Sequence, residues 1–136
     1  MTLIVDASVA LKWFLDEEGR DEADALLGGE PLTAPDFLLL ECGNTFAVKA
    51  RRGQLDAAAT RDYLVTLRHE LGVRFRPSEP YMVTAHALAL DLQRSAYDCL
   101  YLAMAIANGD QVVTADEKFE RAVRASKTHA PFIRRL

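Results

Sequence analysis

The sequence predicts an α/β protein in which helices flank a mainly parallel central sheet. Short apolar, β-branched runs alternate with longer helical patterns along all 136 residues. This alternation favours parallel strands, because each helix returns the chain to the start of the next strand. Half of the residues are hydrophobic and 26% are charged, which is enough apolar surface for a core. We find no repeat, low-complexity tract or linker, and we expect one domain over residues 1–136.

Five short apolar runs are the expected strands. The first covers residues 2–5, and runs of similar composition cover 32–34, 73–75, 111–114 and 132–133. Each is only as long as a strand and is followed by a turn or a capping residue.

Capping and turn residues delimit the expected helices. Ser8, whose hydroxyl can accept a hydrogen bond from a backbone N–H, is the expected cap of the first helix. Further helices are expected through the acidic stretch up to Gly28, from Asp36 to Arg52, from Asp56 or Thr60 to Leu71, from Glu79 to Gln93, from Asp98 to Ala107, and from Asp116 to Ala125.

The composition indicates a soluble cytoplasmic domain. No apolar run is long enough to span a bilayer, and Met1 is followed by a strand and Asp6 rather than by a secretory leader. Cys42 and Cys99 form no redox or metal-ligand motif, so we expect buried free thiols in a reducing compartment.

The net charge of −4 is unevenly distributed. Residues 16–30 carry seven acidic side chains and one arginine, whereas residues 44–76 carry seven basic and three acidic ones. Segregated charges leave a basic region that can attract a nucleic acid, although an ordinary solvated helix face also explains either segment alone.

Two candidate site residues follow expected strands. Asp6 directly follows residues 2–5, and Asp116 comes one residue after 111–114. Both therefore lie at the carboxyl edge of a parallel sheet, where α/β proteins bind ligands. Each is also placed to cap the helix that follows it.

Two further acids occur in apolar surroundings. Glu41 lies in a helix that is apolar nearly all round, so we expect it to be largely buried and either paired with an arginine or bound to a metal. Asn44, three residues on, can hydrogen-bond to Glu41 or to a ligand. Asp98 precedes an uncharged run, where a helix-capping role competes with metal binding.

Together the four acids form the kind of oxygen-rich set that Mg²⁺ or Mn²⁺ prefers. Such a cation offsets the repulsion among the acids, activates water, and neutralises the charge that develops on a phosphodiester. The three histidines (His69, His86 and His129) show no metal-ligand spacing, which favours phosphoryl chemistry over a zinc site.

Four segments resemble the signature of the PIN-domain family, and in particular VapC-type toxins, over essentially the whole chain. They are Val5 to Ser8, Glu41 with Asn44, the YDCLYLA run from Tyr97, and the TADEKF run from Thr114. The resemblance implies a PIN-like three-layer sandwich with a catalytic, metal-binding quartet (Asp6, Glu41, Asp98 and Asp116) and supporting polar residues (Ser8, Asn44 and Thr114). It also implies a Mg²⁺- or Mn²⁺-dependent endoribonuclease that cleaves RNA, forms a homodimer, and is the toxin partner of a cognate antitoxin protein.

Other interpretations stay open. A solitary PIN-type RNA-processing nuclease would share the quartet, whereas a PIN fold kept only for protein binding has no need of four intact acids. A phospho-acceptor signalling domain also begins with a strand that ends in Asp. It requires an acceptor aspartate after a central strand, but Arg76 and Pro77 follow residues 73–75.

Overall fold

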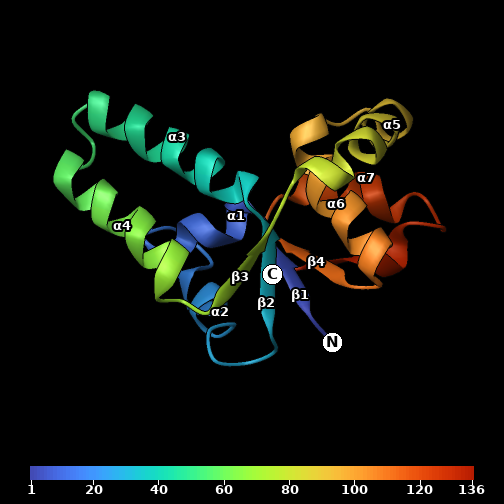
Figure 1. The fold of residues 1–136 in the computed structure, drawn as a ribbon, viewed down its shortest axis with the longest axis horizontal. Coiled ribbons are helices and arrows are strands. Elements are labelled where there is room, and N and C mark those ends of the chain that lie inside the picture. Colours follow the sequence, from blue (N-terminus) through green and yellow to red (C-terminus); the bar gives the residue numbers. More distant parts are fainter.

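The computed structural model describes residues 1–136 and is built around five strands (Figure 1). They are β1 (Leu3–Val5), β2 (Leu32–Pro35), β3 (Val73–Arg76), β4 (Gln111–Thr114) and β5 (Ile133–Arg135), in the order β3-β2-β1-β4-β5. Every neighbouring pair is parallel. The predicted α/β sandwich with a parallel sheet is therefore confirmed.

Seven α-helices form the outer layers. One side of the sheet carries α1 (Ala7–Ala10), α2 (Arg20–Asp24), α3 (Phe37–Arg51) and α4 (Ala57–His69), and the other carries α5 (Met82–Leu92), α6 (Ala96–Asn108) and α7 (Glu117–Arg124) (Figure 1). Three short 3₁₀ turns occupy Leu11–Trp13, Glu79–Tyr81 and Ala130–Phe132. None of the helices combines the length and the apolar character that crossing a membrane requires.

The core joins the central strands to α6. All residues of β1 and β2 are buried, and α6 buries an unbroken run from Cys99 to Ala105. Thirty hydrophobic residues form one buried cluster, and full burial of each large side chain contributes about 1.5–3 kcal/mol. The two cysteines are free and buried, as the sequence predicted.

The first two helices differ from expectation. Asp6, not Ser8, caps α1, because Asp6 Oδ1 accepts a hydrogen bond from the Val9 N–H at 3.2 Å. The acidic segment forms only the five-residue helix α2, since neighbouring carboxylates repel one another along a helix. Trp13 Nε1 donates a 2.8 Å hydrogen bond to the Ala23 carbonyl and fixes this short helix against the core.

The sheet order places a ligand-binding position at the end of β1. From β1 the chain moves outward to β2 and β3, and it then crosses back to β4 on the other side of β1. The α-helices on the two sides of the sheet diverge at such a switch point, which leaves a crevice outside the carboxyl ends of the two strands. Asp6 and Asp116 follow those two strands.

Candidate functional site

Asp6 lies at the carboxyl end of β1 and is held by two hydroxyl groups. It is only 6% exposed. Thr114 Oγ1, at the end of β4, donates a 2.5 Å hydrogen bond to Asp6 Oδ2, and Ser8 Oγ donates one of 2.6 Å to Asp6 Oδ1. The Ser8 hydroxyl also accepts a 2.9 Å hydrogen bond from the Ala115 N–H. These bonds join the ends of the two central strands and place Ser8 and Thr114 beside Asp6, as expected.

Asp116 follows β4 and caps α7. Its Oδ1 accepts a hydrogen bond from the Phe119 N–H at 3.1 Å, and its Oδ2 lies 3.4 Å from Arg94 Nη2. The capping role that the sequence allowed is therefore present, and it engages only one of the two carboxylate oxygens.

Asp98 does not cap α6, which corrects the capping alternative. Ser95 is the cap, because its hydroxyl accepts a hydrogen bond from the Asp98 N–H at 3.1 Å. The Asp98 carboxylate, in the first helical turn, takes no part in capping, and its Oδ2 lies 3.2 Å from Arg94 Nη2.

Arg94 was not identified from the sequence, yet it pairs with both Asp98 and Asp116. Its side chain is 24% exposed, and its Nε is buried without a hydrogen-bond partner. The guanidinium is thus held mainly by the two negative charges. The four-residue spacing between Arg94 and Asp98 was the available signal, because that spacing brings opposite charges together next to a helix.

Glu41 is half-buried rather than deeply buried, and it has no arginine partner. Tyr101 of α6 donates a 2.7 Å hydrogen bond from its hydroxyl to Glu41 Oε1. A buried tyrosine needs a partner for its hydroxyl, so this contact links α3 to α6. Leu40 is 68% exposed, so α3 does not pack against the core on all of its faces. Asn44 is also exposed; of its two possible partners, Glu41 or a ligand, it forms no hydrogen bond to Glu41.

The four carboxylates influence one another in a continuous series. Burial raises the pKa of Asp6 to about 6, and the neighbouring Glu41 charge adds to this effect. Burial also raises the pKa of Glu41, with a further contribution from Asp98. Burial likewise raises the pKa of Asp98, where Asp116 adds to the effect and Arg94 opposes it. The sequence-predicted acids are therefore close enough to repel.

The donor set suits a hard divalent cation, because all four side chains offer carboxylate oxygens. In this conformation, however, no three His, Cys, Asp or Glu side chains lie close enough together to hold one ion. Arg94 supplies positive charge to two of the acids instead. A metal at this site would therefore need Asp98 or Asp116 to turn away from Arg94.

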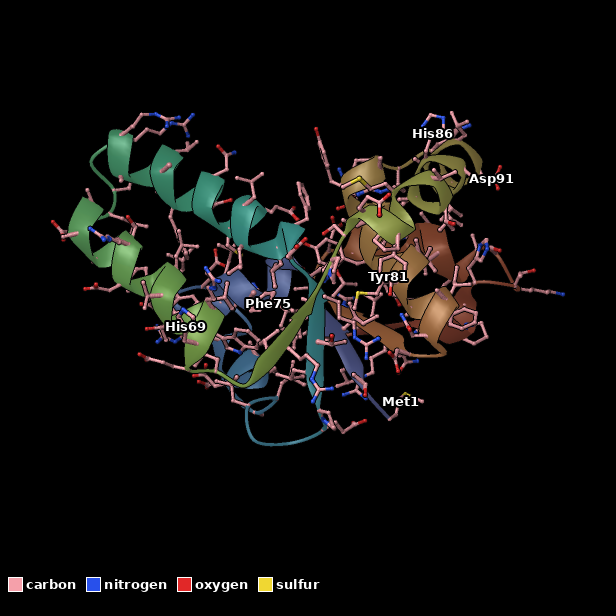
Figure 2. All side chains as sticks on the ribbon, in the orientation of Figure 1. Met1, His69, Phe75, Tyr81, His86 and Asp91 are labelled. Atoms are coloured by element: carbon pink, nitrogen blue, oxygen red, sulfur yellow. The ribbon has the colours of Figure 1, made fainter.

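The thiols of Cys42 and Cys99 lie beside the acids, because the charges of Glu41 and Asp98 add to the effect of burial in raising their pKa values. His69 on α4 and His86 on α5 are on opposite flanks of the molecule (Figure 2). Burial raises the pKa of Cys99 to about 11, so its reactive thiolate form is scarce at neutral pH. The acids are the chemically distinctive groups of this edge.

The first prediction concerns pH. Burial raises the pKa of Asp6 in the folded protein from its ordinary value of 3.8 to about 6, so protonated Asp6 stabilises the fold below about pH 4 and this stability is lost as pH rises through about 6. At pH 7, Asp6→Asn should therefore need more urea to unfold than wild type, because its free energy of unfolding is larger by on the order of 3 kcal/mol. At pH 3.5 the two free energies of unfolding should differ little. Urea titrations in EDTA measure this, and a wild-type advantage at pH 7 would contradict it.

The second prediction concerns Arg94. In EDTA, Arg94→Met should lower the free energy of unfolding by about 1–2 kcal/mol, because two neighbouring carboxylates lose their counter-charge. Arg124→Met, which breaks the exposed pair with Glu120, is the matched control and should cost under about 0.5 kcal/mol. Equal effects of the two substitutions in thermal melts would show that Arg94 is an ordinary surface ion pair.

The comparisons with known proteins agree with this fold. The PIN domain model matches residues 3–125. The structure of PAE2754 from Pyrobaculum aerophilum is similar with a TM-score of 0.70 at 23% identity, covering 90% of this chain and 79% of that one. No curated protein sequence matches the chain.

Two other solved structures share the fold. The Mycobacterium tuberculosis toxin VapC20, described as cleaving the sarcin-ricin loop, gives a TM-score of 0.67 at 17% identity, covering 88% of this chain and 94% of that one. The VapBC2 complex from Rickettsia felis, bound to promoter DNA, gives a TM-score of 0.68 at 11% identity, covering 99% of this chain and 98% of that one. Because the family model spans the chain from β1 to the end of α7, this protein belongs to the PIN domain family.

Proposed function

We propose that this protein is a metal-dependent endoribonuclease that acts as the toxin of a toxin–antitoxin pair. The observation that carries the proposal is a series of neighbouring carboxylates near the carboxyl end of β1, in which the charge of each acid raises the pKa of the next and a cation would relieve the repulsion. Membership of the PIN domain family and the fold shared with VapC20 support a nuclease.

Asp6, Asp98 and Asp116 are the proposed metal-holding residues, with Glu41 as a further ligand or as the group that takes a proton from water. A bound Mg²⁺ or Mn²⁺ would supply an activated water and neutralise charge on the scissile phosphate. Ser8 and Thr114 keep Asp6 in place through their hydroxyl hydrogen bonds. Tyr101 does the same for Glu41, which fixes the orientation of a group that would otherwise rotate freely.

RNA is the proposed substrate because the chain carries a separate basic region. Most basic residues of the 44–76 segment (Lys49, Arg51, Arg52, Arg61 and Arg68) lie on the helical hairpin of α3 and α4, which extends away from the sheet (Figure 1). Their charge can contact phosphates outside the site, while the acids act on one phosphodiester. The negative net charge of the chain is therefore compatible with RNA binding.

An antitoxin partner is proposed from the fold shared with the VapBC2 complex and from the charge of the site. A carboxylate cluster attracts Arg or Lys side chains as it attracts a metal. Arg94 of this same chain already pairs with two of the acids. A basic antitoxin segment would therefore meet Asp6 and Glu41, the members of the quartet that Arg94 does not contact.

A homodimer is proposed through α5. Most large apolar residues of the first helices pack in or against the core: Trp13 and Leu38 are buried, and Leu11, Phe14, Phe37 and Leu39 are partly buried. Exposed apolar side chains are found instead on α5, where Met82 is 52%, Val83 84% and Leu90 69% exposed. Exposed apolar residues on one helix can form the contact with a second copy of the chain.

The third prediction tests the nuclease. Wild type should cleave single-stranded RNA with Mn²⁺ and stop growth when expressed, whereas Asp98→Asn should do neither, because it removes a ligand charge at constant volume. Asp21→Asn on α2, an exposed aspartate outside the quartet, is the matched control and should retain both properties. RNA cleavage that is equal in wild type and Asp98→Asn, in preparations free of host nuclease, would overturn the proposal.

The fourth prediction tests the dimer. Light scattering of wild type should give twice the 15.1 kDa chain mass, and Val83→Lys combined with Leu90→Lys should give one chain mass, because burying two charges is costly. Val65→Lys on α4, where Val65 is 47% exposed, should leave the mass unchanged. A double variant that keeps the wild-type mass would place the interface elsewhere.

A further inference from the structure

A pocket of about 530 Å³ opens beside Glu41, between the start of α3 and the start of α6. Its lining residues are Phe37, Leu40, Glu41, Asn44, Thr45 and Tyr97. We propose that this pocket binds one unpaired nucleobase of the RNA substrate, with Tyr97 as the stacking surface. The inference rests on the proposed nuclease function and adds a residue that selects the cleavage position.

The first observation is an exposed aromatic pair. The rings of Phe37 and Tyr97 stack with their centroids 5.3 Å apart and an interplanar angle of 16°. Tyr97 nevertheless remains 64% exposed, so Phe37 supports the ring while leaving much of it uncovered. A rigid aromatic ring held in this way is the usual platform for an unstacked base in single-stranded RNA.

The second observation is a polar edge on the same pocket. Asn44 is exposed and presents an amide that can both donate and accept hydrogen bonds. The Thr45 hydroxyl donates to the Glu41 carbonyl at 3.3 Å, which leaves its lone pairs available. A nucleobase combines an aromatic face with a hydrogen-bonding edge, so it matches both parts of this lining.

The third observation is charge and position. Glu41 is the one charged residue in the lining, so the pocket repels a phosphate and accepts a neutral base. Glu41 is also a member of the quartet, and Tyr97 immediately precedes Asp98. A base held here would therefore place its own phosphate next to the carboxylates.

The experiment uses the full chain and two readouts. Binding of a fluorescein-labelled single-stranded RNA is measured in EDTA, where cleavage is prevented, for wild type, Tyr97→Ala, Tyr97→Trp and the control Val65→Ala. Tyr97→Ala should bind about tenfold more weakly, as expected for loss of one stacked base. Tyr97→Trp keeps a platform and, like the control, should stay within about twofold of wild type.

The second readout is the sequence at the cut. With Mn²⁺ and a mixed-sequence RNA, wild type should favour one base beside the cleaved bond, and Tyr97→Ala should lose that preference. If wild type cleaves while Tyr97→Ala binds equally well and keeps the same cut sites, the pocket inference is overturned and the nuclease proposal stands. A wild type that neither binds nor cleaves RNA would overturn both. A changed mass of Tyr97→Ala in light scattering would assign the surface to a protein contact instead.

Discussion

Repulsion between neighbouring carboxylates of the quartet, from Asp116 through Asp98 and Glu41 to Asp6, is the main electrostatic constraint on this fold. Several features keep the folded state stable in its presence. Two hydroxyl groups donate to Asp6, and the Tyr101 hydroxyl donates to Glu41. Arg94 places one positive charge between Asp98 and Asp116. The raised pKa of Asp6, about 6, shows that these contacts do not fully offset its burial. Collecting such charges has a physical rationale if a divalent cation completes the site.

The rest of the fold positions those charges. The parallel sheet, in which all residues of β1 and β2 are buried, supports the site from below. The strand order puts the crevice at the carboxyl ends of β1 and β4. The buried run of α6 fixes Asp98 at one end of a helix that packs on both β1 and β4. α3 brings Glu41 to the same edge, and Tyr101 ties it to α6. Each acid thus comes from a different element, so no local sequence segment contains the site.

The sequence predicted those features that follow from the periodicity of apolar residues and from the positions where strands end. Asp6 and Asp116 could be placed because the residue after a parallel strand lies at the sheet edge, whatever else the chain does. The sequence overestimated the burial of Glu41, because the burial of a helix face depends on which neighbours pack against it. Leu40, on the same helix, faces solvent. Arg94 escaped prediction for a similar reason: it lies between two helices, where its side-chain direction is set by tertiary structure. For Asp98 the sequence left a capping role and metal binding open, whereas the Ser95 hydroxyl is the cap of α6.

We propose that the quartet collects negative charge in order to hold a metal ion. A crystal structure of the protein with Mn²⁺, using anomalous diffraction at the manganese edge, tests this directly. We expect an anomalous peak at the carboxyl end of β1, within bonding distance of Asp6 and of Asp98 or Asp116, with Arg94 turned away from at least one of its carboxylates. An unchanged pairing of Arg94 with both acids, and no manganese at this edge at saturating concentration, would contradict it.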